Sequence, residues 1–152
     1  MNDFRAHIVE NFEIFECSLN FNEDALKNVI KEVYQLESNP SYHEVTGRTF
    51  KIKKGYHSVN LIDEKYGILE KFHYINILCS RVQELLTNHF KVDNLDFVNN
   101  CYGQLEIKEI WINILRITDY NLPHNHPHND ISGNFYLKTI KNKIHDTDGS
   151  LL

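Results

Sequence analysis

Apolar residues recur at intervals of three and four along residues 23–37, and this spacing predicts an amphipathic helix. Asn22 precedes the helix as a favourable N-cap, and the acids Glu23 and Asp24 suit the positive end of the helix dipole. Pro40 follows, and because proline disfavours helical geometry in the residue before it, the helix should end before this position. The apolar positions are Ala25, Leu26, Val29, Ile30 and Val33.

A second helical pattern covers residues 65–90 and predicts a longer amphipathic helix whose apolar stripe packs in the core. His73 and His89 lie on this helix without a partner at ligand spacing, so we interpret them as surface or hydrogen-bonded histidines. The stripe consists of Phe72, Ile75, Leu78, Cys79, Val82, Leu85 and Leu86.

Three other stretches, residues 8–19, 105–117 and 131–140, have patterns that predict strands. In the second stretch Asn113 interrupts an apolar face, and a satisfied buried amide or an amide directed at a ligand explains it equally well. One face of that strand carries Ile110, Ile112 and Ile114, and the other carries Trp111, Leu115 and Ile117. In the third stretch Phe135 and Leu137 share one face, whereas Ser132, Asn134 and Tyr136 share the other. This mixture of helices and strands predicts an α+β fold.

Length and charge narrow the picture further. The 152 residues suit one domain, 1–152, and the net charge of −5 with scattered basic residues offers no continuous surface for nucleic acid. The first residues lack the basic segment followed by an apolar segment that is typical of a signal peptide. No apolar run approaches the ~20 residues that cross a bilayer. We therefore expect a cytoplasmic protein without a membrane partner. Three cysteines far apart and without CxxC spacing predict buried free thiols: Cys17, Cys79 and Cys101.

The densest group of possible metal ligands is the segment 124–130, His-Asn-His-Pro-His-Asn-Asp. In an extended segment residues i and i+2 project from the same face, so His124 and His126, or His126 and His128, can converge on one ion. Two histidines and a carboxylate with open positions are the ligand set of non-haem iron(II) oxygenases, which favours iron modestly over zinc, copper or nickel. A polar loop that binds no metal fits an isolated HxH pair equally well.

The residues around this segment resemble a family of 2-oxoglutarate/Fe(II) oxygenases found in bacteria and marine phages. That family's pattern runs from W-x-N through a short turn into H-x-H-P and then S-G-x-x-Y-L. Here it is matched by Trp111-x-Asn113, Pro123-His124-x-His126-Pro127 and Ser132-Gly133-x-x-Tyr136-Leu137. The upstream segment Gly55-Tyr56-His57-Ser58 is similar to the family's G-W-H-S, with Tyr in place of Trp.

The resemblance implies N-terminal helices packed on a double-stranded β-helix, or jelly-roll barrel, and an Fe(II)/2-oxoglutarate-dependent dioxygenase activity. His124 would be the first metal ligand, and His126 would stand where prolyl hydroxylases place the Asp of their HxD pair. Whether His126 or Asp130 completes this part of the ligand set stays open. Asn113 and Tyr136 would bind the cofactor 2-oxoglutarate, and the substrate would be a small molecule or a protein side chain.

The family's barrel takes a further histidine and a basic residue from later strands, but only 15 residues follow Leu137. We therefore expect this chain to be the N-terminal portion of a longer oxygenase barrel, or a truncated homologue. His145, the only downstream histidine, is expected to be solvated because it lacks a local partner. A barrel cut midway exposes strand edges, which predicts a homodimer or aggregation.

Two further hypotheses compete with the oxygenase. In the first, the chain is a non-catalytic relative that binds a metal or ligand. In the second, it is a phage or host interaction protein with the histidines on its surface. Hydrolase and nucleotide-binding functions are disfavoured, because the sequence has no acyl-transfer nucleophile arrangement, P-loop or GxGxxG.

Overall fold

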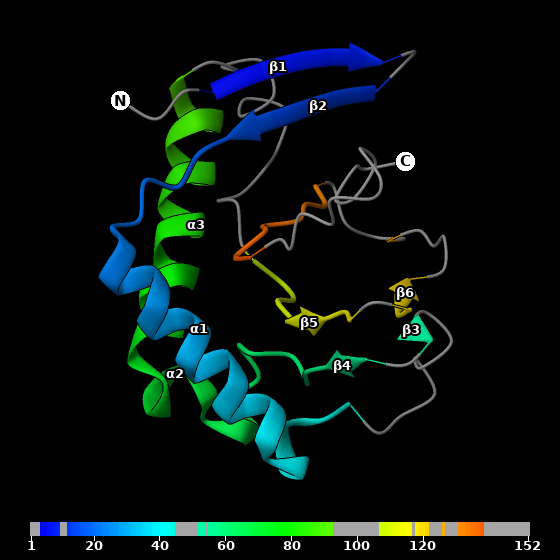
Figure 1. Cartoon of the computed structure of the whole chain (residues 1–152). Coiled ribbons are helices and arrows are strands. Elements are labelled where there is room, and N and C mark those ends of the chain that lie inside the picture. Colours follow the sequence, from blue (N-terminus) through cyan, green and yellow to red (C-terminus); the bar gives the residue numbers. More distant parts are fainter. Residues whose placement is uncertain are drawn as a thin grey trace.

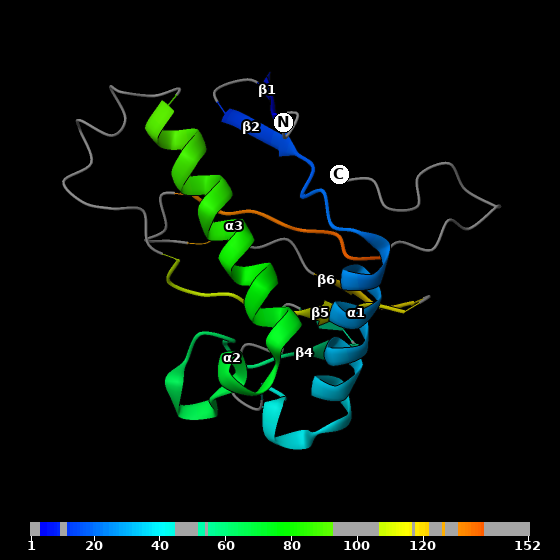
Figure 2. The same ribbon diagram turned by 90° about the vertical axis from the view of Figure 1, so that its left-hand side faces the viewer.

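The computed structural model describes residues 4–9, 12–44, 52–53, 55–92, 107–116, 118–121, 126 and 131–138. Helices and antiparallel strands alternate along the chain, so the predicted α+β class is confirmed. Figures 1 and 2 show the main helices side by side, both covering the same side of a group of short strands.

The first main helix, α1, runs over Glu23–Ser38, as the apolar spacing predicts. Asn22 is its N-cap, because the Asn22 side chain accepts a hydrogen bond from the Ala25 N–H at 2.7 Å. The helix ends at Asn39, and Pro40 opens the short 3₁₀ helix η1, Pro40–Tyr42.

The second helical region is interrupted, so the prediction of one continuous helix over residues 65–90 is wrong at its start. The 3₁₀ helix η3 covers Glu64–Tyr66, α2 covers Ile68–Lys71 and α3 covers His73–Val92. Between η3 and α2, Gly67 adopts a left-handed backbone conformation with φ +57. Between α2 and α3, Phe72 is extended with φ −115. The break lets α2 and α3 meet at an angle, and Glu32 of α1 accepts a hydrogen bond from the Ile75 N–H in the first turn of α3.

The N-terminal strand prediction was incomplete. Two strands, β1 (Phe4–Val9) and β2 (Phe12–Cys17), pair antiparallel where the sequence pattern indicated one strand over residues 8–19. In Figure 1 this pair lies beside the C-terminal end of α3, and β2 leads into α1.

The remaining strands are each two residues long, and only β5 lies within a stretch that the sequence pattern predicted as a strand. β3 (Ile52–Lys53) pairs with β6 (Tyr120–Asn121), and β4 (Tyr56–His57) pairs with β5 (Asn113–Ile114), both antiparallel. Over the described residues 107–116, the predicted strand 105–117 is reduced to β5, although backbone hydrogen bonds continue the pairing to Ile110. The predicted strand 131–140 is wrong over 131–138, which lie outside any strand. Only Leu137 of that stretch packs against the core.

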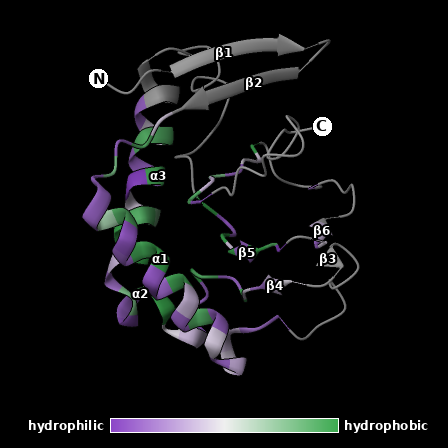
Figure 3. Ribbon diagram, in the orientation of Figure 1, coloured by the Kyte–Doolittle hydropathy of each residue, from purple (hydrophilic) through white to green (hydrophobic). Residues whose placement is uncertain are grey.

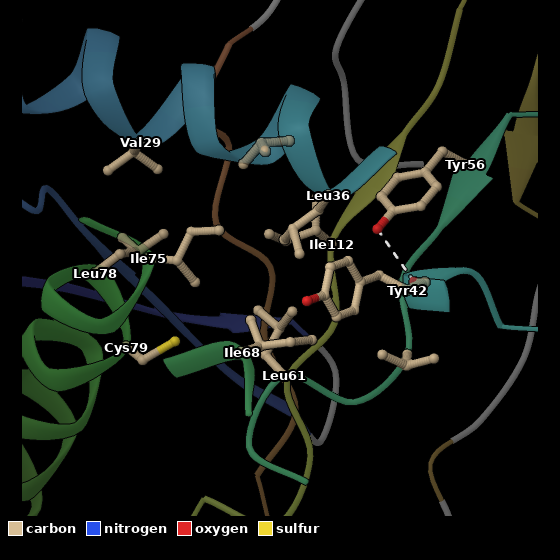
Figure 4. Close-up of a cluster of buried hydrophobic side chains, with 12 residues drawn as sticks. Val29, Leu36, Tyr42, Tyr56, Leu61, Ile68, Ile75, Leu78, Cys79 and Ile112 are labelled. Atoms are coloured by element: carbon tan, nitrogen blue, oxygen red, sulfur yellow. Dashed lines mark hydrogen bonds between the residues drawn. The ribbon is translucent and has the colours of Figure 1, made fainter. Parts of the chain in front are cut away.

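The core lies between the helices and one face of the β4–β5 pair. Figure 3 shows apolar and polar residues alternating along α1 and α3, so each helix has an apolar stripe, and Figure 4 shows the buried side chains meeting. The cluster comprises Val29, Val33, Leu36, Tyr42, Tyr56, Val59, Leu61, Ile68, Ile75, Leu78, Cys79 and Ile112. No buried side-chain nitrogen or oxygen in the described part of the chain lacks a hydrogen-bond partner.

The last turn of α1 joins the helix to the strands. The His43 Nε2–H donates to the Glu37 carbonyl oxygen at 2.6 Å, and the Arg116 guanidinium donates to the Glu37 carboxylate. These contacts join the C-terminal end of α1 to the segments that precede β4 and follow β5. Within the residues described, no helix is both long and apolar enough to cross a membrane.

Candidate functional site

The β4–β5 pair separates the side chains of two sequence segments onto two faces. Tyr56 lies opposite Ile114 and His57 lies opposite Asn113, and neighbouring residues of a strand point to opposite faces. Tyr56 and Ile112 accordingly belong to the helix-covered core. His57, Asn113 and Trp111 fall on the other face, and this face carries the candidate site.

Gly55 and Tyr56 fix the start of β4. Gly55 has φ +87, and a Cβ at this position would lie 2.7 Å from the Ile114 carbonyl oxygen, so a larger residue requires the strands to separate. The Tyr56 hydroxyl donates to the Tyr42 carbonyl oxygen at 3.3 Å (Figure 4). Burial raises the pKa of Tyr56 well above its ordinary value, with the Glu37 charge adding to the effect, so the phenol stays protonated.

Ser58 replaces a backbone acceptor in the pairing of the two strands. Its backbone N–H donates to the Ile112 carbonyl oxygen at 3.0 Å, but the Ile112 N–H donates to the Ser58 hydroxyl at 2.9 Å instead of to the carbonyl. The Ser58 carbonyl oxygen accepts from the His57 ring at 2.8 Å. The fully buried hydroxyl therefore frees the carbonyl that orients the imidazole.

His57 is held through both ring nitrogens. Because a carbonyl oxygen only accepts, Nδ1 must carry the proton that it donates to Ser58. Nε2 lies 3.5 Å from Oε2 of the Glu44 carboxylate, and this contact is attractive when Nε2 also carries a proton, as it does in the imidazolium form. The His57 and Glu44 side chains are 18% and 16% exposed, so this contact is largely shielded from solvent. Glu44 reaches this position because its N–H donates to the His57 carbonyl oxygen and His43 pairs with Ser58.

The Trp111 indole contacts two imidazoles from distant parts of the chain. The His57 ring lies 5.8 Å from the indole, centroid to centroid, at an interplanar angle of 33°. The His126 ring lies 5.6 Å away at 25°, which is a stacked arrangement. Both separations fall in the range of favourable aromatic pairs. The structure thus brings together the segments around Tyr56, Trp111 and His126, which the family resemblance singled out separately.

The other residues that the sequence predicted for the site either lie outside the described residues or are exposed. His124, His128 and Asp130 lie outside the described residues, as does His145. Asn113 is exposed, and Tyr136 is 54% exposed. Neither forms a side-chain hydrogen bond among the described interactions. No three His, Cys, Asp or Glu side chains of the described part of the chain are grouped so that they could hold a metal ion.

Other polar or reactive residues are accounted for by the fold. His73 is exposed on α3 and contacts only the Tyr74 ring among the interactions described, which fits its interpretation as a surface histidine. Cys79 is buried and free, as expected, and burial raises the pKa of its thiol from 9.0 to about 11. The side chains of Cys17, His89 and Cys101 lie outside the described residues.

Sequence reasoning missed Glu44. Its place beside His57 depends on the bridge between His43 and Ser58, and no pattern around Glu44 indicates that pairing. His57 itself was noticed only as part of the Gly55–Ser58 resemblance. In the structure Tyr56, His57 and Ser58 alternate between buried, partly exposed and buried, which places the His57 side chain away from the core.

Comparisons with protein-family models, with curated proteins and with solved structures gave no match.

Proposed function

We propose that this chain is part of a non-haem Fe(II)/2-oxoglutarate-dependent dioxygenase that hydroxylates a small molecule or a protein side chain. In this proposal the strands belong to a double-stranded β-helix, His124 and His126 bind Fe(II), and Asn113 and Tyr136 bind 2-oxoglutarate. The enzyme would act in the cytoplasm, without nucleic-acid or membrane partners, and its exposed strand edges would support a homodimer.

The observation that carries the proposal is the division of the β4–β5 pair into two faces. Helices cover one face, and the opposite face gathers His57, Trp111 and Asn113, with His126 stacked on the indole. A barrel wall has this character, because its outer face is covered by helices while its inner face carries the site. The chemistry of the donor set also fits, since imidazole and carboxylate are ligands of iron(II) in oxygenases.

Each residue then has a defined task. His124 and His126 would supply neutral imidazole donors, and the half-buried setting of His126 against Trp111 limits the positions that its ring can take. The Asn113 amide and the Tyr136 hydroxyl are exposed, so both remain accessible to the carboxylates of 2-oxoglutarate. Fe(II) with 2-oxoglutarate supplies oxidative decarboxylation to succinate coupled to hydroxylation by O₂; the protein's contribution is positioning and the exclusion of water.

The direct test is uncoupled turnover. The protein is incubated with Fe(II), 2-oxoglutarate and O₂, and succinate is measured; we expect release from the wild type and none from the His124→Ala, His126→Ala double variant. The matched control is His73→Ala, which removes an exposed histidine on α3 whose ring contacts Tyr74, and which should leave succinate release unchanged. No succinate from the full-length protein would contradict the oxygenase proposal.

Anaerobic titration separates the competing functions. Addition of Fe(II) and then 2-oxoglutarate should produce the visible charge-transfer band of the chelate. Metal uptake without this band would indicate a metal-binding relative without catalysis. No stoichiometric uptake at all would indicate an interaction protein in which the histidines are a surface feature.

A further inference from the structure

Trp111 links two histidines that otherwise belong to separate parts of the structure. The His57 imidazole comes from β4, and the His126 imidazole comes from the predicted ligand segment, yet both rings lie within 6 Å of the same indole. Stacked or tilted ring pairs at such separations attract each other beyond the effect of the area that they bury. Stacking on the indole therefore helps to fix the His126 ring, and this contact depends on what fixes Trp111.

His57 is fixed more firmly than a surface histidine. Its Nδ1–H donates to the Ser58 carbonyl oxygen at 2.8 Å, and its Nε2 lies 3.5 Å from a Glu44 carboxylate oxygen. In the imidazolium form both nitrogens donate, and a 180° turn of the ring would replace both N–H donors by C–H groups, so the two contacts select one ring orientation. The ring is also confined by its low exposure, and its plane presents one face to the indole.

We infer that Glu44 and His57 are positioning residues that act through Trp111 to hold the His126 imidazole in a single orientation. The chain of contacts runs from the Glu44 carboxylate to His57, then to the indole, and then to His126. This inference rests on the proposed function only where it treats His126 as a metal ligand; the orientation of the ring is a property of the protein without metal.

The physical consequence is preorganisation. A ligand ring that already has its bound orientation loses less conformational entropy when an ion arrives, and loss of outer residues that orient ligands costs about 10–100-fold in metal affinity. The described contacts that lead from Glu44 and His57 to His126 run through the Trp111 indole, so an effect transmitted along them should pass through this ring.

The first experiment uses the full chain without metal. Trp111 is the only tryptophan, so ring-current shifts of the His126 ring protons report its stacking. His126→Ala identifies these signals by their loss. In Glu44→Gln and His57→Asn, we expect the His126 signals to move towards the positions of an exposed histidine, whereas Glu44→Asp should restore part of the shift. His73→Asn is the control and should leave the signals unchanged.

The second experiment titrates the same variants with Co(II) and follows quenching of Trp111 fluorescence. We expect His126→Ala to abolish saturable quenching and Glu44→Gln to weaken Co(II) binding about 10–100-fold. Far-UV circular dichroism and the thermal midpoint confirm that each variant is folded, so a loss of fold is recognised separately.

The two experiments fail independently. If the wild type binds no Co(II) while Glu44→Gln and His57→Asn still shift the His126 signals, the metal-binding proposal is wrong and the positioning inference stands. Unchanged His126 signals in both variants would overturn the positioning inference, whatever the metal affinity.

Discussion

The two faces of the β4–β5 pair differ in what their residues contribute. On the helix-covered face, Tyr56, Ser58 and Ile112 are almost completely buried, and their polar atoms are paired within the protein. On the opposite face, Asn113 is exposed and His57 is held by hydrogen bonds and ring contacts. Substitutions on the first face should therefore reduce stability, while substitutions on the second should change binding with little effect on stability.

The largest effect is expected for Leu36→Ala. Leu36 lies on α1 and its side chain is fully buried in the core (Figure 4). Truncating such a leucine typically costs about 2–5 kcal/mol of unfolding free energy because a cavity remains. Urea unfolding followed by circular dichroism measures the loss. Gln35→Ala, at the exposed neighbouring position, should change the unfolding free energy by less than about 0.5 kcal/mol. Equal losses in both variants would contradict the proposed core.

Gly55→Ala tests the close approach at the start of β4. The alanine would have to adopt φ +87 with its Cβ 2.7 Å from the Ile114 carbonyl oxygen, and such backbone strain costs about 1–3 kcal/mol. Gly133→Ala is the matched control, since no atom lies within 4 Å of its Cβ position. Thermal unfolding of both variants measures the difference, and equal midpoints would show that β4 and β5 are not this close.

Ser58→Ala tests whether the hydroxyl is required for strand pairing. The variant leaves the Ile112 N–H without its acceptor in a buried position, which costs about 1–3 kcal/mol. Ser80→Ala removes an exposed hydroxyl on α3 that donates to Asn76, and should have little effect. Chemical unfolding of the two variants compares them; a stable Ser58→Ala protein would mean that the Ile112 N–H finds another acceptor.

The buried Cys79 thiol should make the stability of the fold depend on pH in the alkaline range. Burial raises the pKa of its thiol from 9.0 to about 11, so above pH 9 the unfolded chain loses this proton while the folded chain keeps it. Stability should therefore fall between pH 9 and 11, by about 2 kcal/mol at pH 10.5, and be unaffected by this group below pH 8. Denaturant unfolding of wild type and Cys79→Ala at pH 8 and pH 10.5 isolates the contribution. A pH dependence that is identical in both proteins would contradict burial of the thiol.

The smallest effect on stability is expected for Asn113→Ala. The Asn113 side chain is exposed on the open face, so its loss should change the unfolding free energy by less than about 0.5 kcal/mol. Under the proposed function the same variant should bind 2-oxoglutarate more weakly, which the anaerobic titration measures. A large loss of stability instead would place Asn113 among the structural residues and remove the contrast between the faces.

Local sequence signals predicted the helices well because helix formation depends on neighbouring residues. The run from Asn22 to Pro40 contains its own start, stripe and end, and α1 follows it closely. The break between η3 and α2 was missed because an isolated Gly67 is compatible with a helix in sequence and only its left-handed conformation ends the preceding turn. The break between α2 and α3 was missed because nothing in the local sequence marks Phe72 as extended. Strand lengths were overestimated because a strand exists only where a partner pairs with it.

For the site, the sequence by itself determined the histidine spacing at residues 124–128 and the presence of one tryptophan near an asparagine. Only the tertiary structure decided that His57 and His126 share the Trp111 ring and that Glu44 lies beside His57. The reason is physical: ligand spacing within a strand is fixed by backbone geometry, whereas contacts between segments far apart in the chain depend on pairing and packing that no local pattern encodes.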